Sequence, residues 1–273
     1  MEGVKSHSER PMLNPSLLDD AGQRIDRFPK EIHAMEILVD SLNEIIVRSR
    51  DKIKLRPDQP ERDLDLLVAV SFGKASKSFQ AINNLCAFGF GEDSLVVVRA
   101  NLNLMINLAY ILAEDSLNRS GALIAYSHKR QIEYLRSAHD TVPDWYQKLD
   151  WEEIDKRAAR WEMNIKERAE KARQSYHYQV GYKFYSSIEH SDVWSLSGYI
   201  AEWDEVGPKV GSGASDKYVS IALNHNFWIM ANILSLFCSH FGISEPEIFA
   251  RIDEQWKLLA TDSAGSEGTI SSL

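Results

Sequence analysis

Apolar residues recur at intervals of three and four positions along almost the whole 273-residue chain, whereas strand signals are scarce. This spacing gathers apolar side chains on one face of an α-helix, while a half-buried strand requires strict alternation. The sequence therefore predicts an all-α protein, a multi-helix bundle of about eight helices with an antiparallel core. The expected helices span residues 29–51, 64–88, 95–113, 117–139, 144–175, a segment that includes 182–190, 217–241 and a last stretch that begins near 246.

Proline and glycine mark the expected ends of the early helices. Pro57 and Pro60 forbid a continuous helix after the first one, because proline lacks the backbone N–H that an interior helical turn requires. Gly89 and Gly91 predict a tight turn, and Asp93 is placed to cap the helix that follows. The second and third expected helices should therefore form an antiparallel hairpin.

The chain shows one domain rather than two. Residues 205–216 are rich in glycine and contain a proline, so we expect a mobile loop there, either a plain connector or a lid. The pattern predicts an N-terminal arm at 1–28, a single helical domain at 29–261 and a disordered tail at 262–273.

The composition, 44% hydrophobic and 26% charged residues, is typical of a soluble globular protein. A net charge of -9 argues against a protein that coats duplex nucleic acid through phosphate contacts, although a local basic patch could still hold RNA. Cys86 and Cys238 form no CxxC pair, which fits a reducing compartment. Residues 1–16 lack the apolar core of a secretory signal, so we expect a cytoplasmic protein.

The apolar run at 95–113 is nearly long enough to span a bilayer. Arg99, Asn101, Asn103 and Asn107 interrupt it, and burying these groups in lipid would be expensive. We therefore expect a central core helix and no association with a membrane.

Polar residues recur every four positions in two helices whose background is otherwise apolar or aromatic. That spacing places them on one face of each helix, and buried polar groups require partners. The simplest interpretation is that the two stripes face each other or a common cleft. They consist of Arg99, Asn103 and Asn107 in the first helix, and of Tyr182, Ser186 and His190 in the second.

Arg99 follows three valines and precedes Ala100 and Leu102, so its guanidinium needs an acceptor inside the protein. It is either a structural arginine that clamps a carboxylate or helix end, or an anion clamp, because its planar fork suits bidentate binding of oxygen atoms. Asn103 is expected to be a hydrogen-bonding companion of Arg99 rather than a catalyst.

His190 is either a core histidine or a proton-transfer group. Lys183, Ser186 and Tyr182 bring a cation, a hydroxyl and a phenol within about two helical turns of it. No GxSxG elbow surrounds Ser186, which argues against a serine hydrolase. The other histidines show no ligand spacing, so the sequence predicts neither a metal site nor a cofactor.

These two segments resemble a family of uncharacterised, all-helical, mostly bacterial proteins with two motifs. The first motif has arginine and, four residues later, glutamate in an apolar helix; here Asn103 takes the place of the glutamate. The second resembles Tyr-Arg-x-Leu-Ser-x-x-Val-His and reads YKFYSSIEH at 182–190, with Lys183 in place of the arginine. The resemblance extends over roughly 64–241.

The second motif is also similar to the signature of HEPN domains, helical ribonucleases and nucleotide-binding proteins. In that family, arginine and histidine from two subunits cleave RNA without a metal, through attack of the 2′-hydroxyl. The resemblance implies a HEPN-like core and a homodimer, with His190 as the acid or base, Lys183 as the phosphate clamp and Arg99 as a second cation. Lysine lacks the bidentate fork of arginine, so a noncatalytic relative is the alternative.

Two functions therefore remain open. The first is a HEPN-like, metal-independent endoribonuclease in a toxin, stress or phage-defence setting. The second is a noncatalytic module that binds a small phosphorylated or other anionic ligand, or a partner protein, through a cleft at Arg99 and His190. A purely structural subunit of a larger assembly is a third possibility.

Overall fold

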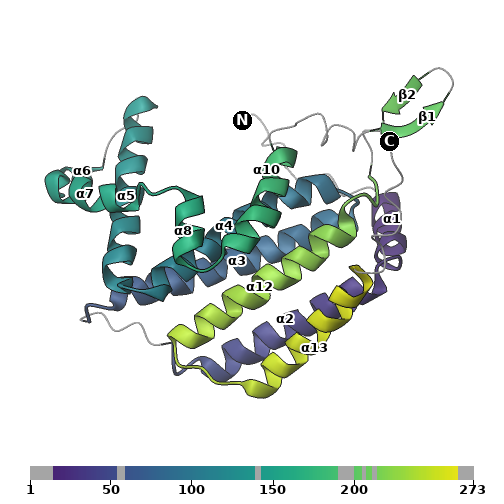
Figure 1. The fold of residues 1–273 in the computed structure, drawn as a ribbon, viewed down its shortest axis with the longest axis horizontal. Helices are drawn as coiled ribbons and strands as arrows, with labels where there is room; N and C mark the ends of the chain where they lie inside the picture. Colours follow the sequence, from purple (N-terminus) through teal and green to yellow (C-terminus); the bar gives the residue numbers. More distant parts are fainter. Residues whose placement is uncertain are drawn as a thin grey trace, which may run out of the picture.

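A computed structural model describes residues 15–53, 59–138, 143–189, 200–204, 207–210 and 214–263 (Figure 1). The secondary structure is almost entirely helical, so the predicted all-α class is confirmed apart from one short hairpin. Its helices are α1 (Pro15–Ile25), α2 (Pro29–Ser49), α3 (Arg62–Ala87), α4 (Gly91–Ala113), α5 (Ser116–Ser137), α6 (Asp144–Gln147), α7 (Trp151–Ala158), α8 (Ile165–Lys171), α9 (Ser175–His177), α10 (Lys183–Glu189), α12 (Val219–His240) and α13 (Pro246–Ser263). A 3-10 turn η1 (Ala159–Trp161), a π-helix η2 (Tyr178–Tyr182) and strands β1 (Ile200–Asp204) and β2 (Gly207–Val210) complete the described elements.

The centre of the protein is a layer of three long helices, α3, α4 and α12, that pack on one another (Figure 1). Helices α2 and α13 pack together and against α12, while α8 and α10 pack against α4. Phe72 of α3 stacks on Phe237 of α12 with ring centroids 4.3 Å apart. On α4, Leu95, Val98 and Leu102 are almost fully buried, as the spacing of three and four predicts.

The turn between α3 and α4 depends on two glycines. Gly89 has φ +78°, a left-handed conformation that glycine adopts without strain. A Cβ on Gly91 would lie 2.1 Å from the carbonyl oxygen of Lys217, so only glycine allows that approach. The predicted cap by Asp93 is wrong: Phe90 is the N-cap residue and no side chain caps the helix. The Ser94 hydroxyl instead donates to the carbonyl of Gly91, at 2.6 Å.

The single helix predicted at 144–175 is wrong, because this stretch divides into α6, α7, η1 and α8. Asp150 accepts a hydrogen bond from the backbone N–H of Glu153 at 3.1 Å, and Asn164 accepts one from Glu167 at 3.0 Å. Such side chains compete with the helical backbone for its N–H groups and begin new helices. Two local caps therefore break the continuous periodic pattern.

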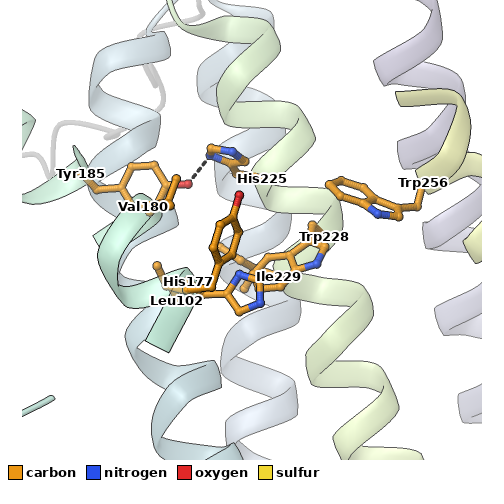
Figure 2. Close-up of a pocket in the computed structure, with 10 residues that line it drawn as sticks. Leu102, His177, Val180, Tyr185, His225, Trp228, Ile229 and Trp256 are labelled. Carbon is orange, nitrogen blue, oxygen red and sulfur yellow. Dashed lines mark hydrogen bonds between the residues drawn. The ribbon is translucent and has the colours of Figure 1, made fainter. Parts of the chain in front are cut away.

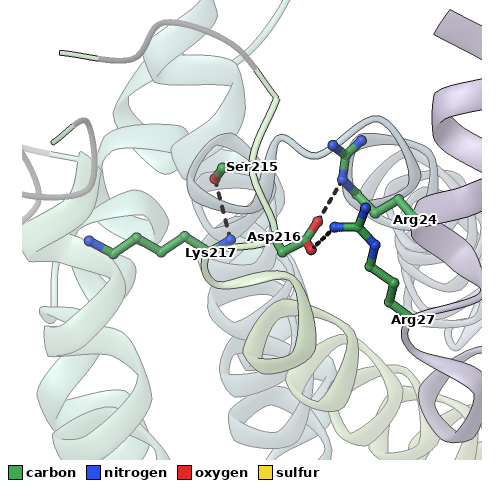
Figure 3. Close-up of polar contacts among 5 residues, drawn as sticks. All are labelled: Arg24, Arg27, Ser215, Asp216 and Lys217. Atoms are coloured by element: carbon green, nitrogen blue, oxygen red, sulfur yellow. Dashed lines mark hydrogen bonds and ion pairs between the residues drawn. The ribbon is translucent and has the colours of Figure 1, made fainter. Parts of the chain in front are cut away.

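The loop predicted at 205–216 is also partly wrong, because Gly207–Val210 forms β2, which pairs antiparallel with β1. Beyond β2, Arg24 of α1 and Arg27 of the turn that follows α1 both bind the Asp216 carboxylate, and the Arg24 contact is 2.8 Å long (Figure 3). Burial alone would raise the pKa of Asp216, but these arginines outweigh burial and hold its pKa below the usual value. Helix α1, which lies inside the predicted N-terminal arm, is thus tied to the start of α12.

Helices α4 and α12 are each long and apolar enough to cross a membrane, judged by length and composition alone. Of the apolar stretch in each, 56% is buried inside the protein, and core helices of soluble proteins pass the same test. Their packing against α3 and each other agrees with the predicted core role of residues 95–113. The cytoplasmic location remains a prediction, and residues 264–273 of the predicted tail lie outside the described residues.

Candidate functional site

Arg99 joins α4 to the segment formed by η2 and α10. Its Nη2 donates a hydrogen bond of 3.0 Å to the Tyr182 hydroxyl, and its Cζ lies 4.7 Å from the centre of the Tyr182 ring. Arg99 also forms an ion pair with Glu189 at the end of α10. The Arg99 side chain is 16% exposed and that of Glu189 is 39% exposed, so the charge is neutralised at the edge of the core. An anion would have to compete with Glu189 for this guanidinium.

The two polar stripes therefore meet, but with different partners from those expected. Asn103 does not bind Arg99; its Oδ1 accepts a hydrogen bond of 3.3 Å from Nδ2 of Asn107. Side chains four residues apart lie next to each other on a helix, so this pair forms within α4. Glu189, which the sequence analysis did not single out, takes the position of main partner to Arg99.

The π-helix η2 precedes α10 and brings it close to α4. A Cβ on Gly181 would lie 3.1 Å from Cδ2 of Leu102 and 3.3 Å from the Tyr185 ring, so glycine permits this close approach. Tyr178 and Tyr182 stack with ring centroids 5.1 Å apart. π-Helical turns are rare and often occur at functional sites, which makes this segment a candidate on backbone geometry alone.

The other predicted site residues lie on or directly after α10. Lys183 is its first residue and is exposed, whereas Ser186 is half-buried. His190 follows Glu189 and lies outside the described residues. Positions seven apart share one face of a helix, which places Tyr182 and Glu189 on the side that Arg99 contacts.

A second feature, which the sequence analysis missed, is an aromatic cavity beside η2 and α10 (Figure 2). Its volume is about 160 Å³, and it lies among residues of α4, α9, η2, α10, α12 and α13. An adjoining cavity of about 400 Å³ shares Val180, His225 and Trp256 with it. The aromatic residues that line the first cavity are Tyr176, His177, Tyr185, His225, Trp228 and Trp256.

Tyr185 and His225 form the polar centre of this cavity. The Tyr185 hydroxyl is hydrogen-bonded to Nδ1 of His225 (Figure 2). Burial, with a smaller effect of neighbouring His177, lowers the pKa of His225 to about 4, and burial raises the pKa of Tyr185. At neutral pH the tyrosine therefore keeps its proton and the imidazole is uncharged, with a single ring proton on Nδ1 or Nε2.

Neither metal chemistry nor thiol chemistry is supported in the part of the chain that the structure describes. No cluster of three or more histidine, cysteine, aspartate or glutamate residues suited to a metal ion occurs there. Cys86 and Cys238 are buried free thiols, and burial raises the pKa of each to about 11. A reactive cysteine has a lowered pKa instead, so these two act as packing residues.

A signal for Glu189 was present in the sequence, because it lies seven residues after Tyr182 on the same helical face. No such signal marked the cavity. His177, His225 and Trp256 come from three separate helices, and only the packing of α9, α12 and α13 brings them together. A search for ligand spacing within one helix cannot find such a set.

Together, the fold and these contacts define a helical bundle with an arginine-clamped helix at its surface. Residues 65–206 match the model of a family of unknown function, DUF5677, which covers just over half of the chain. The chain therefore belongs to the DUF5677 family. No match was found among the curated proteins or among the solved structures.

Proposed function

We propose that this protein is a HEPN-like, metal-independent endoribonuclease that works as a homodimer, with Lys183 and His190 as its catalytic residues. The similarity of YKFYSSIEH to the HEPN signature supports the reaction class. Membership of DUF5677 agrees with the family resemblance of the sequence but names no activity. A toxin, stress or phage-defence setting belongs to this proposal as the usual context of such ribonucleases.

The observation that carries the proposal is the contact of Arg99 with Tyr182 and Glu189. Tyr182 directly precedes α10, and Glu189 is its last residue. The two contacts therefore fix α10 to α4 at both ends. Glu189 also precedes His190 in the chain, so the clamp restrains the backbone from which His190 extends. Catalytic groups require such restraint, because small errors in position are costly in rate.

In this interpretation Arg99 is a positioning residue rather than a phosphate clamp. Its charge is already paired with Glu189, whereas Lys183 at the start of α10 is exposed. Lys183 would bind a phosphate oxygen of the RNA. His190 would transfer the proton as the 2′-oxygen forms its bond to phosphorus and the 5′-oxygen leaves, which yields a 2′,3′-cyclic phosphate and a 5′-hydroxyl end.

The test is cleavage of end-labelled RNA of mixed sequence in the presence of EDTA. We expect the wild-type protein to release fragments with 2′,3′-cyclic phosphate ends, and His190→Ala to slow cleavage by about a hundredfold or more. The matched control is His33→Ala, which removes an exposed histidine of α2 and should leave the rate unchanged.

The unfolding curves of wild type, His190→Ala and His33→Ala must agree. A slower cleavage rate in His190→Ala then reflects the loss of a catalytic group rather than a loss of folded protein. An absence of cleavage by the wild type, or equal rates for wild type and His190→Ala, would overturn the proposal. In that case the noncatalytic binding module becomes the better interpretation of the fold.

A further inference from the structure

We propose that the cavity beneath η2 and α13 binds a neutral, planar heteroaromatic molecule that accepts a hydrogen bond from His225. This site is separate from the Lys183 face and does not depend on RNA cleavage. The first cavity, at about 160 Å³, is of the size that holds one small ring system, and the adjoining cavity leaves room for a substituent.

The lining of the two cavities explains why the ligand should be neutral. Among the residues that the structure describes, no lysine, arginine, aspartate or glutamate lines either cavity. Burial lowers the pKa of both His177 and His225, so both imidazoles are uncharged at neutral pH. An ionic ligand would lose its hydration without gaining a counter-charge.

The rings around the cavity explain why the ligand should be planar and aromatic. His177 packs on Trp228 with centroids 3.9 Å apart and planes inclined by 35°, and Tyr176 meets His177 edge to face. Trp256 of α13 contributes a further ring to both cavities (Figure 2). A flat ring can stack against such walls, whereas a bulky aliphatic group cannot use their faces.

Two polar atoms explain why the ligand should also form hydrogen bonds. When the Tyr185 hydroxyl donates to Nδ1 of His225, the ring proton lies on Nε2, which then is a donor without a hydrogen-bond partner among the described residues. Asn224 lines the adjoining cavity, and its Oδ1 is buried without a hydrogen-bond partner in the described structure. A heteroaromatic ring with a ring nitrogen and a polar substituent would satisfy both atoms.

The mouth of the cavity is apolar and open. Tyr176 is 70% exposed and Val180 is 52% exposed, and both line it. Exposed apolar residues of this kind also serve as contact sites for a second copy of a chain or for another protein. The test is therefore designed to separate a small ligand from a protein partner.

Calorimetric titration of the purified protein at mildly alkaline pH provides the test, with three probes built on the same fused bicyclic skeleton. Benzimidazole is neutral and carries an acceptor nitrogen, indole is neutral and lacks one, and 1,3-dimethylbenzimidazolium is a cation. We expect benzimidazole to bind, indole to bind about tenfold more weakly for want of the hydrogen bond, and the cation not to bind measurably.

Variants then locate the binding. Val180→Trp should block the mouth and abolish the heat of benzimidazole binding, while Val70→Trp, at a 60% exposed position of α3 outside the cavity, should bind like the wild type. His225→Phe should remove the tenfold preference of benzimidazole over indole.

Three outcomes would overturn the inference: binding of the cation as strong as that of benzimidazole, unchanged binding in Val180→Trp, or no binding of any probe. Sedimentation of the same proteins would reveal a protein occupant, since self-association that Val180→Trp alone abolishes would assign the mouth to a subunit interface. These readouts involve no RNA, so they are distinct from a failure of the ribonuclease proposal.

Discussion

Two neighbouring sites on the segment formed by η2 and α10 differ in how they handle charge. At the first site, Tyr182 and Glu189 contact the charged side chain of Arg99 at the edge of the core. At the second site, Tyr185 meets an uncharged histidine within a cavity of aromatic rings. Two tyrosines only three positions apart therefore lie in a charged and a neutral environment.

The difference shows how one short helix can separate a charged site from a neutral one. Charge is tolerated where a carboxylate that reaches solvent can pair with it, and Glu189 is 39% exposed. Deeper in the bundle, burial suppresses charge, and it lowers the pKa of His225 to about 4. We therefore expect substitutions at the Arg99 contacts to leave the cavity around His225 intact, and substitutions in the cavity to leave the Arg99 contacts intact.

The largest expected effect is a pH dependence of the free energy of unfolding, which arises from His225 in the aromatic cavity. Its pKa is about 4 in the folded protein and 6.5 ordinarily, so between these values the unfolded chain binds a proton that the folded chain does not. The free energy of unfolding should therefore fall as pH falls through this window, by about 3 kcal/mol for this residue. His177, whose pKa burial also lowers, contributes in the same direction.

Urea unfolding at a series of pH values checks this expectation. His225→Gln cannot titrate, so the difference in unfolding free energy between wild type and variant should narrow steadily as the pH is lowered from 6.5 towards 4. A constant difference across the window would show that His225 titrates normally and that the cavity is not the neutral environment described.

The next effect concerns the charged side. Arg99→Ala leaves Glu189 unpaired and removes the hydrogen bond to Tyr182, and we expect a loss of about 2 kcal/mol in the free energy of unfolding. Arg130→Ala, which breaks an exposed pair with Glu133, is the control and should cost less than about 0.5 kcal/mol. Equal costs for the two variants in urea unfolding would mean that Arg99 does not clamp α10.

A smaller effect separates the hydroxyl of Tyr182 from its ring. Tyr182→Phe keeps the stacking on Tyr178 and the contact of Arg99 with the ring, but it loses the 3.0 Å hydrogen bond. Thermal unfolding should show a loss of about 1 kcal/mol. Tyr134→Phe, at a 70% exposed position of α5, should show no loss. An equal loss in Tyr134→Phe would mean that the loss in Tyr182→Phe does not report the hydrogen bond to Arg99.

The smallest effect on stability is expected at Lys183, one of the two residues proposed to be catalytic. Lys183 is exposed at the start of α10, so Lys183→Ala should change the free energy of unfolding by less than about 0.5 kcal/mol. The rate of RNA cleavage should nevertheless fall, and Lys183→Arg, which restores a bidentate fork, should raise it. If Lys183→Ala cleaves RNA as fast as the wild type, Lys183 is not the phosphate-binding residue.

Much of the fold could be predicted from the sequence, because the long helices follow the apolar period directly. The hairpin of α3 and α4 was predictable from Gly89 and Gly91. These two glycines also explain why α3 ends at Ala87. The breaks between α6, α7 and α8 were not, since they depend on whether Asp150 and Asn164 cap a new helix or continue the old one. Local pattern alone does not decide that competition.

The candidate site could be predicted only in part. Arg99 and Tyr182 stood out because a polar group in an apolar helix needs a partner, and the structure shows them bonded to each other. The pairing of Asn103 with Asn107 rather than with Arg99 depends on side-chain rotamers that no spacing fixes. The cavity around His225 depends on how α9, α12 and α13 approach one another, which is a property of the tertiary packing.

The proposal that RNA cleavage and ligand binding occur at separate sites can be tested most directly in one assay. This assay measures RNA cleavage in EDTA by wild type, His190→Ala and Val180→Trp. We expect His190→Ala to lose cleavage, while Val180→Trp, which changes only the mouth of the cavity, cleaves at the rate of the wild type. Wild-type rates in His190→Ala, or an equal loss in both variants, would contradict the assignment of chemistry to Lys183 and His190 and of ligand binding to the aromatic cavity.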